Sequence, residues 1–174
     1  MLLGHQTSHN ITDIYKIMQN GYLRPGTKTG IVRMYGQNLS KYIYLMFFDI
    51  TGGLPHLELD SNLLLENISW LNKSWNGEPS KNYTIKVDGS KIDKKQLQEI
   101  LKKYRNDIKS QNLPKTFLQH EILLEKDIDL VKYLRKLTLF RSVKGKKTYY
   151  KLLKLMKRKY PNVEIIMYNP KKRK

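Results

Sequence analysis

One segment constrains the fold more than any other part of the chain: Phe117–Leu137, FLQHEILLEKDIDLVKYLRKL. It does so because it places one carboxylate, Glu121, near the start of an apolar run. We interpret Phe117 to Glu125 as a short strand, followed by an acidic turn and a second apolar segment. The carboxylate then has two interpretations. It lies on the solvent face of an edge strand, or it projects into a cleft and stabilises positive charge that develops on a sugar.

The amino-terminal segment predicts a strand followed by a helix. Leu2, Leu3 and Gly4 lead into the polar residues His5, Gln6 and Thr7. Ser8 or Asn10 can cap the helix, because their side chains accept hydrogen bonds from the first backbone N–H groups. Apolar residues then recur at helical spacing up to Met18, and Gly21 is suited to the left-handed helix end. His5 is therefore expected at the end of a strand, directly before a helix.

Three segments in this order resemble the catalytic domains of ADP-ribosyltransferases, in the poly(ADP-ribose) polymerase and diphtheria-toxin-like branch. His5-Gln6-Thr7, the helix and the Gly-Tyr-Leu-Arg-Pro turn resemble the first family motif, Leu-x-His-Gly-Thr/Ser, a helix and Gly-Leu-x-Pro. Tyr42–Phe47 resembles the second, Gly-Ile-Tyr-Phe. Ile128–Leu134, after Glu121, resembles the third, Val/Ile-x-Leu-x-Tyr-Leu. The matches cover somewhat less than half of the chain, and the three motifs occur in the family's order.

The resemblance implies that NAD is the substrate and assigns a role to each residue. His5 would contact a ribose hydroxyl on the adenosine side of NAD, and Tyr44, with Tyr42 as the second choice, would stack on nicotinamide. Glu121 would hydrogen-bond the nicotinamide ribose and favour the cationic transition state over the ground state. Gln6 and Thr7 would complete the NAD-binding segment, and no metal is implied. From the residues alone, His5 can equally be an ordinary polar residue, and Tyr42 and Tyr44 alternate with Ile43 and Leu45 as in a buried strand.

The chain departs from the family pattern at two positions. Gln6 stands where the family has the glycine whose backbone grips the nicotinamide carboxamide, and Tyr42 replaces the glycine of the second motif. A catalytically inactive member of the family is therefore an alternative. Gln119 lies two residues before Glu121, on the same side of a strand, where the family's toxins carry a residue that helps to select the acceptor. His120 would point to the opposite side and is expected to be structural.

The net charge of +18 in 174 residues predicts a polyanionic partner, with nucleic acid as the first candidate. We expect a helix with one apolar and one basic face around Tyr149 to Met156, and assign nucleic-acid contacts to Lys146, Lys147, Lys151 and Arg158. Tyr149 and Tyr150 would stack on bases. The alternatives are a solvated basic helix and a lysine-rich composition inherited from an AT-rich genome.

We predict one α+β domain at 1–168 and a basic tail at 169–174. The expected fold is a split, mainly antiparallel mixed sheet that encloses an NAD cleft and has helices on its flanks. Further strands are expected at 57–60, 83–87 and 163–168, and a helix, capped by Asp93, from Lys94 to about Ser110. Trp70 and Trp75 are assigned to core packing rather than to the NAD cleft.

The setting is expected to be intracellular, in the cytoplasm or the nucleus. The chain has no cysteine, no apolar run of membrane-spanning length and no signal peptide. The tail is similar to a nuclear-import signal, but it can equally be a frayed basic terminus. The lysine- and asparagine-rich composition suits a large DNA virus or an intracellular bacterium.

The leading hypothesis is an NAD-dependent mono-ADP-ribosyltransferase whose acceptor is nucleic acid or a nucleic-acid-bound protein. Transfer of a single unit is expected because the chain begins almost at the first motif, without room for a regulatory helical domain. A catalytically inactive, basic nucleic-acid-binding module on the same fold is the first alternative. An NAD-dependent RNA 2′-phosphotransferase is the second, although its basic signature is not clear here. The sequence leaves the oligomeric state open.

Overall fold

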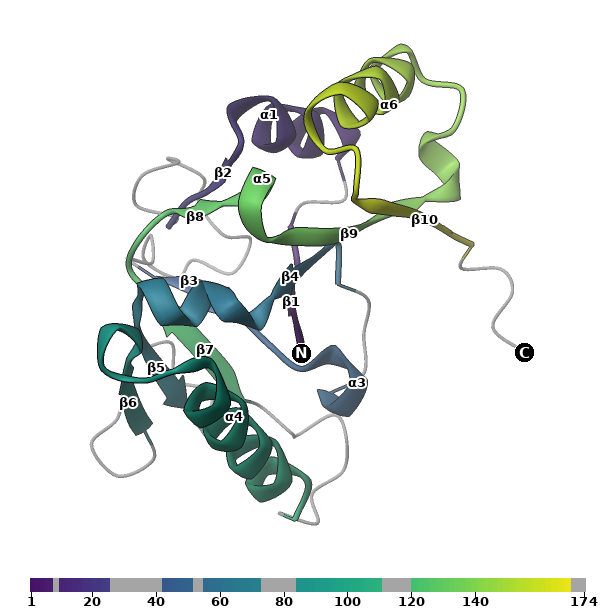
Figure 1. The fold of residues 1–174 in the computed structure, drawn as a ribbon. Helices are drawn as coiled ribbons and strands as arrows, with labels where there is room; N and C mark the ends of the chain where they lie inside the picture. Colours follow the sequence, from purple (N-terminus) through teal and green to yellow (C-terminus); the bar gives the residue numbers. More distant parts are fainter. Residues whose placement is uncertain (8–9, 26–41, 52–54, 73–83, 111–119, 170–174) are drawn as a thin grey trace.

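The computed structural model describes residues 1–7, 10–25, 42–51, 55–72, 84–110 and 120–169, which form a mixed α+β fold (Figure 1). The strands are β1 (Leu2–His5), β2 (Tyr22–Leu23), β3 (Ile43–Leu45), β4 (Leu57–Asp60), β5 (Ile68–Asn72), β6 (Thr84–Asp88), β7 (Glu121–Leu124), β8 (Ile128–Asp129), β9 (Leu134–Phe140) and β10 (Glu164–Tyr168). The helices are α1 (Ile11–Asn20), α3 (Phe48–Thr51), α4 (Lys94–Lys109), α5 (Leu130–Tyr133) and α6 (Lys147–Lys159), with 3₁₀ turns η1 (Ser61–Glu66), η2 (Gly89–Lys91) and η4 (Arg141–Val143).

Two four-stranded sheets form the centre of the fold. Sheet 1 has the strand order β1-β4-β9-β10, and only its β9–β10 pair is parallel. Sheet 2 has the order β3-β7-β5-β6 and is antiparallel throughout. A short antiparallel pair, β2–β8, lies apart from both. The expectation of an α+β fold built on mainly antiparallel sheets is confirmed.

One pair of backbone hydrogen bonds joins sheet 1 to sheet 2. The Gly4 N–H donates to the Met46 carbonyl over 2.8 Å, and the Met46 N–H donates to the Gly4 carbonyl over 2.9 Å. A Cβ atom at position 4 would overlap the ring of Phe48 and lie 2.8 Å from Cβ of Pro55. Glycine is therefore required here by the close approach of the two sheets.

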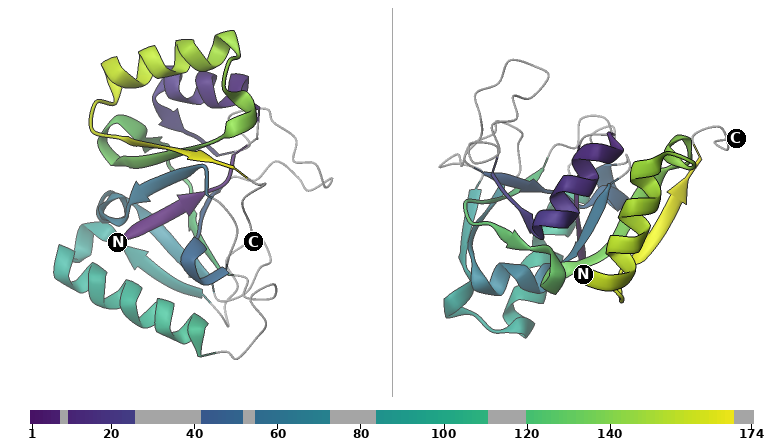
Figure 2. Two further views of the ribbon diagram at one scale, coloured as in Figure 1. Left: turned by 90° about the vertical axis from the view of Figure 1, so that its right-hand side faces the viewer. Right: turned by 90° about the horizontal axis from the view of Figure 1, so that it is seen from above.

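Helices α1 and α6 lie side by side on one flank of sheet 1 (Figures 1 and 2). Helix α1 begins as predicted, because the Asn10 side chain accepts a hydrogen bond from the Thr12 N–H over 2.9 Å. It ends as predicted at Gly21, whose φ of 92° is left-handed. Tyr160 directly follows α6. Its hydroxyl donates to the Met18 carbonyl over 2.7 Å and so ties the two helices together.

Helix α4 lies beside sheet 2, at the opposite end of the molecule from α1 and α6 (Figure 1). Asp93 and Gln96 form the reciprocal capping box at its start, so the predicted cap is confirmed. Its buried residues are Leu97, Leu101, Tyr104 and Ile108. The Tyr104 hydroxyl donates to the Asn72 carbonyl and so fixes the helix to the end of β5.

Three expected elements differ from the structure. The strand predicted for 117–125 spans Glu121–Leu124 within the described residues, and 117–119 lie outside them. This strand pairs on both sides, with β3 and β5, so the interpretation of Glu121 as an edge-strand residue is wrong. The strand expected at 83–87 spans Thr84–Asp88 within the described residues, and 83 lies outside them, whereas the strand expected at 163–168 begins one residue later, at Glu164. None of the described helices has the length and apolar character that a membrane crossing requires.

We expect Gly4→Ala to open the junction between the sheets, because the new methyl group overlaps Phe48 and Pro55. The free energy of unfolding should fall by about 2 kcal/mol. Amide hydrogen exchange should become faster at Met46, whose N–H bonds to Gly4.

Gly145→Ala is the matched control for this substitution. Its φ of 93° is also unfavourable for alanine, but a Cβ atom at position 145 meets nothing within 4 Å. This variant should lose about 1 kcal/mol and leave exchange at Met46 unchanged. Equal exchange in the two variants would show that the junction tolerates a side chain.

Candidate functional site

The register of sheet 2 places the predicted tyrosine and glutamate on one face. Tyr44 on β3 is opposite Leu123 on β7, and Trp70 on β5 is opposite the same leucine. Glu121 is two residues from Leu123, so its side chain points to the same side of the sheet. Tyr44, Trp70 and Glu121 therefore share one face of three adjacent strands. We call it the aromatic face and include Tyr42, which precedes β3.

The aromatic face is separate from the main hydrophobic core. Leu123 and Tyr42 are buried, yet neither belongs to the main core cluster, which contains Leu45 and Ile122 from the opposite face of the sheet. The Tyr42 and Trp70 rings meet edge to face, with centroids 5.6 Å apart. Trp70 is half-buried and packs on the buried Tyr42 outside that cluster, so its assignment to core packing stays a prediction. Trp75 lies outside the described residues.

His5 reaches this site across the junction between the sheets. Its Nδ1 lies 2.7 Å from the carbonyl oxygen of Tyr44. Because a carbonyl only accepts, the hydrogen must be on Nδ1, and in the neutral ring Nε2 is then an acceptor. An acceptor at Nε2 matches the contact with a ribose hydroxyl that the resemblance implies. The structure thus brings His5 and Tyr44 together directly, and places Glu121 on the strand next to Tyr44.

Glu121 is 1% exposed, although carboxylates are rarely buried to this extent. Its backbone carbonyl accepts a hydrogen bond from the Tyr104 hydroxyl over 3.3 Å. Burial raises the pKa of that hydroxyl, and the negative charge of Glu121 raises it further. Tyr104 therefore stays a neutral donor beside the carboxylate.

The other residues assigned to NAD occupy less informative positions. The Gln6 side chain is exposed. The Thr7 N–H donates to Nδ1 of His56 over 3.0 Å, and His56 is completely buried. Gln119 lies outside the described residues.

His120 is structural, as expected. It is completely buried, and its Nε2 accepts a hydrogen bond from the Phe47 N–H over 2.9 Å. Its ring stacks on Phe47, with centroids 5.6 Å apart, and meets the edge of Tyr104. Burial lowers the pKa of His120 to about 4, against a smaller opposite effect of Asp49. The neutral ring ties the end of β3 to the start of β7, next to Glu121.

The four basic residues predicted to meet nucleic acid are all exposed around α6. Lys147, Lys151 and Arg158 share one side of the helix with Lys154, since these residues recur at spacings of three and four. We call these four residues the basic stripe; Lys146 precedes the helix. Tyr150 is 59% exposed and can meet a base, but Tyr149 is buried, so the stacking role expected for Tyr149 is wrong.

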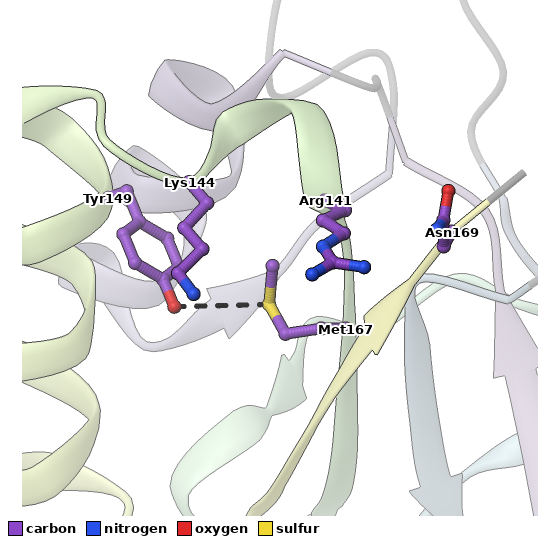
Figure 3. A pocket seen from close by; sticks show the side chains of 5 residues that line it. All are labelled: Arg141, Lys144, Tyr149, Met167 and Asn169. Atoms are coloured by element: carbon purple, nitrogen blue, oxygen red, sulfur yellow. Dashed lines mark hydrogen bonds between the residues drawn. The ribbon is translucent and has the colours of Figure 1, made fainter. Parts of the chain in front are cut away.

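Two pockets between described residues lie away from the aromatic face. One, of ≈ 330 Å³, is lined by Arg141, Lys144, Tyr149, Met167 and Asn169 (Figure 3). The other, of ≈ 300 Å³, lies around the junction and includes Gly4, Phe48 and Arg105. Neither is lined by Tyr44 or Glu121, so the expected NAD cleft is not among them. Within the described ranges, no group of three or more acidic or histidine side chains is arranged to hold a metal ion.

Sequence reasoning missed the contribution of Trp70 and Leu123 to the aromatic face, and it missed the pocket at Arg141 and Lys144. The alternation in Ile68–Asn72 assigns Trp70 to one face of a strand, but it does not reveal the neighbouring strands. Arg141 and Met167 meet only because β9 and β10 pair in parallel.

The chain matches no family model, and no curated protein or solved structure gives a significant match to it.

We expect the stability of the protein to fall between pH 6.5 and pH 4 through His120. The unfolded chain takes up a proton at this residue near pH 6.5, whereas in the folded protein the pKa is about 4. The unfolded state therefore binds more protons in this window, and the free energy of unfolding falls by on the order of 3 kcal/mol as the pH drops through it. Above pH 6.5 the effect vanishes.

Urea unfolding at several pH values tests this expectation. His120→Asn keeps an acceptor for the Phe47 N–H but does not titrate. The slope of its free energy of unfolding against pH should therefore be smaller than that of the parent protein, by the contribution of one proton. Identical slopes for the two proteins would contradict the assignment.

Proposed function

We propose that this chain is an NAD-dependent mono-ADP-ribosyltransferase, with nucleic acid or a nucleic-acid-bound protein as the acceptor. The observation that carries the proposal is the position of His5, Tyr44 and Glu121 relative to sheet 2. Two of them share the aromatic face of sheet 2, and the third is hydrogen-bonded to the backbone of Tyr44. The family resemblance selects the same three residues, of which Tyr44 lies 39 positions after His5 and Glu121 lies 77 positions after Tyr44.

The chemistry of the aromatic face fits NAD. The half-buried rings of Tyr44 and Trp70 offer flat surfaces on which a nicotinamide ring can stack. The same face carries Glu121, the carboxylate that a developing cation requires. A ring-stacking surface on the same face as a carboxylate suits cleavage of a nicotinamide–ribose bond.

In the reaction, the bond between the nicotinamide nitrogen and the ribose carbon breaks, and its electron pair leaves with nicotinamide. Glu121 stabilises the positive charge that remains on the ribose, because a buried carboxylate acts more strongly there than in water. His5 would position the substrate through Nε2, while Nδ1 holds the ring to Tyr44. The acceptor oxygen or nitrogen then donates an electron pair to the ribose carbon and loses its proton to solvent.

The positive charge supports nucleic acid as the acceptor or as its carrier. The basic stripe is exposed along α6, and the chain as a whole carries +18. Such a field concentrates polyanions near the protein and speeds their association.

The second candidate is a nucleic-acid-binding module without catalysis. The low exposure of Glu121, 1%, favours this candidate, because the carboxylate is covered in the structure. The exposed Gln6 in place of the family's glycine also favours it. The two candidates differ in one property, the release of nicotinamide.

We expect Glu121→Gln to lower nicotinamide release from NAD by about 100-fold or more, because the amide is nearly isosteric but uncharged. Chromatography of nicotinamide and mass spectrometry of the acceptor measure the reaction. The matched control is Glu125→Gln, which removes an exposed carboxylate just beyond the same strand and should leave the rate unchanged.

Equal rates for the parent protein and Glu121→Gln would remove Glu121 from the mechanism. If the parent protein neither binds NAD in calorimetry nor releases nicotinamide, yet binds oligonucleotides, the module is the correct function.

A further inference from the structure

The pocket near the amino-terminal end of α6 combines positive charge with hydrogen-bonding groups. Arg141 and Lys144 come from the segment between β9 and α6, and both point toward Met167 on β10 (Figure 3). The Tyr149 hydroxyl lies 3.9 Å from the sulfur of Met167, and the side chain of Asn169 lines the far side. In the described part of the chain, Arg141 and Lys144 form no ion pair with an acidic side chain; these two cations suit an anionic ligand.

The size and lining of the pocket suit a ligand larger than a simple anion. Its volume of ≈ 330 Å³ is in the lower range of small-molecule sites. A guanidinium and an ammonium group bind a phosphate by charge-assisted hydrogen bonds. Met167 offers a polarizable apolar contact, and the amide of Asn169 can both donate to and accept from a base.

The pocket lies at the same end of sheet 1 as His5. Strands β1 and β9 both run antiparallel to β4, and β10 runs parallel to β9. The carboxyl ends of the three strands therefore point the same way. Arg141 directly follows β9, and Asn169 directly follows β10.

A continuous set of contacts links this end of β1 to the end of β10. The His56 N–H donates to the His5 carbonyl over 3.1 Å. The His56 ring lies 5.7 Å from that of Phe140, and Phe140 meets Tyr168 edge to face at 5.6 Å. From strand spacing and rise, Arg141 lies roughly 15 Å from His5. A few nucleotides of extended strand cover this span.

From this arrangement we infer that the pocket holds one unpaired nucleotide of a single-stranded nucleic acid, with its phosphate between Arg141 and Lys144. A base-paired duplex cannot place a nucleotide in a pocket, so the strand must be single or locally opened. If the bound nucleic-acid strand is also the acceptor of ADP-ribose, this inference rests on the proposed function. Binding of a nucleotide in the pocket does not require catalysis.

Fluorescence anisotropy with labelled single-stranded DNA and RNA oligonucleotides, in the absence of NAD, tests the inference on the full chain. The double variant Arg141→Gln, Lys144→Gln should bind about tenfold or more weakly at low salt. The slope of log affinity against log salt should become less steep by about 0.7, the value for one phosphate contact on a single strand. Both residues are exposed, so the variant should keep its fold, which circular dichroism checks.

The matched control is Lys102→Gln, Lys103→Gln, which removes the same two charges from the exposed side of α4. It should weaken binding less than threefold and leave the salt slope unchanged, since its effect is only that of net charge. Equal losses in the two double variants would overturn the inference, because binding would then depend on total charge rather than on the pocket.

Competition separates a nucleotide site from a simple anion site. Adenosine monophosphate should displace the oligonucleotide at a much lower concentration than inorganic phosphate does. Equal displacement by the two competitors would overturn the inference. Loss of NAD binding in Arg141→Gln, Lys144→Gln with unchanged oligonucleotide binding would also overturn it, since the pocket would then belong to the dinucleotide.

The proposed function and this inference fail independently. A parent protein that releases no nicotinamide but loses oligonucleotide binding in the pocket variant supports the pocket and rejects the transferase. A parent protein that transfers ADP-ribose, with oligonucleotide affinity unchanged in the pocket variant, supports the transferase and rejects the pocket.

Discussion

The reciprocal hydrogen bonds between Gly4 and Met46 are the contact on which the rest of the site depends. They are the point where sheet 1 meets sheet 2, and they bring the end of β1 beside β3. His5 follows Gly4 directly and reaches the Tyr44 carbonyl from there. A side chain at position 4 would overlap Phe48, so the approach is possible only with glycine. This contact therefore sets the position of the His5 imidazole, on sheet 1, relative to the Glu121 carboxylate, on sheet 2.

Three histidines hold the backbone around this junction, each through one ring nitrogen. His5 donates to the Tyr44 carbonyl, whereas His56 accepts from the Thr7 N–H and His120 accepts from the Phe47 N–H. A ring nitrogen accepts only when it carries no proton, so His56 and His120 fulfil these roles as neutral rings. For His120, burial enforces this state by lowering the pKa to about 4. The backbone next to Glu121 is thus held by His120, an imidazole that burial keeps neutral at physiological pH.

The positive charge and the buried carboxylate occupy different parts of the molecule. The basic stripe and the Arg141–Lys144 pocket lie around α6, beside sheet 1, whereas Glu121 lies within sheet 2. This separation keeps the cations from neutralising the carboxylate whose charge the proposed reaction uses. It also suits a protein in which, as proposed, a nucleic-acid strand and NAD bind to neighbouring but distinct surfaces. The two surfaces meet at the end of β1.

The sequence by itself determined the local elements. The Asn10 and Asp93 caps, the left-handed Gly21, the apolar spacing of α4 and the alternation at β4 were all predicted, because these signals act over a few residues. The sequence also selected His5, Tyr44 and Glu121, but only through a family resemblance. Only the tertiary structure decided that β7 is an interior strand, that Trp70 shares a face with Tyr44, that Tyr149 is buried and that Arg141 faces Met167. Alternation tells which residues of a strand share a face, whereas long-range pairing decides which strands are neighbours and what each face meets.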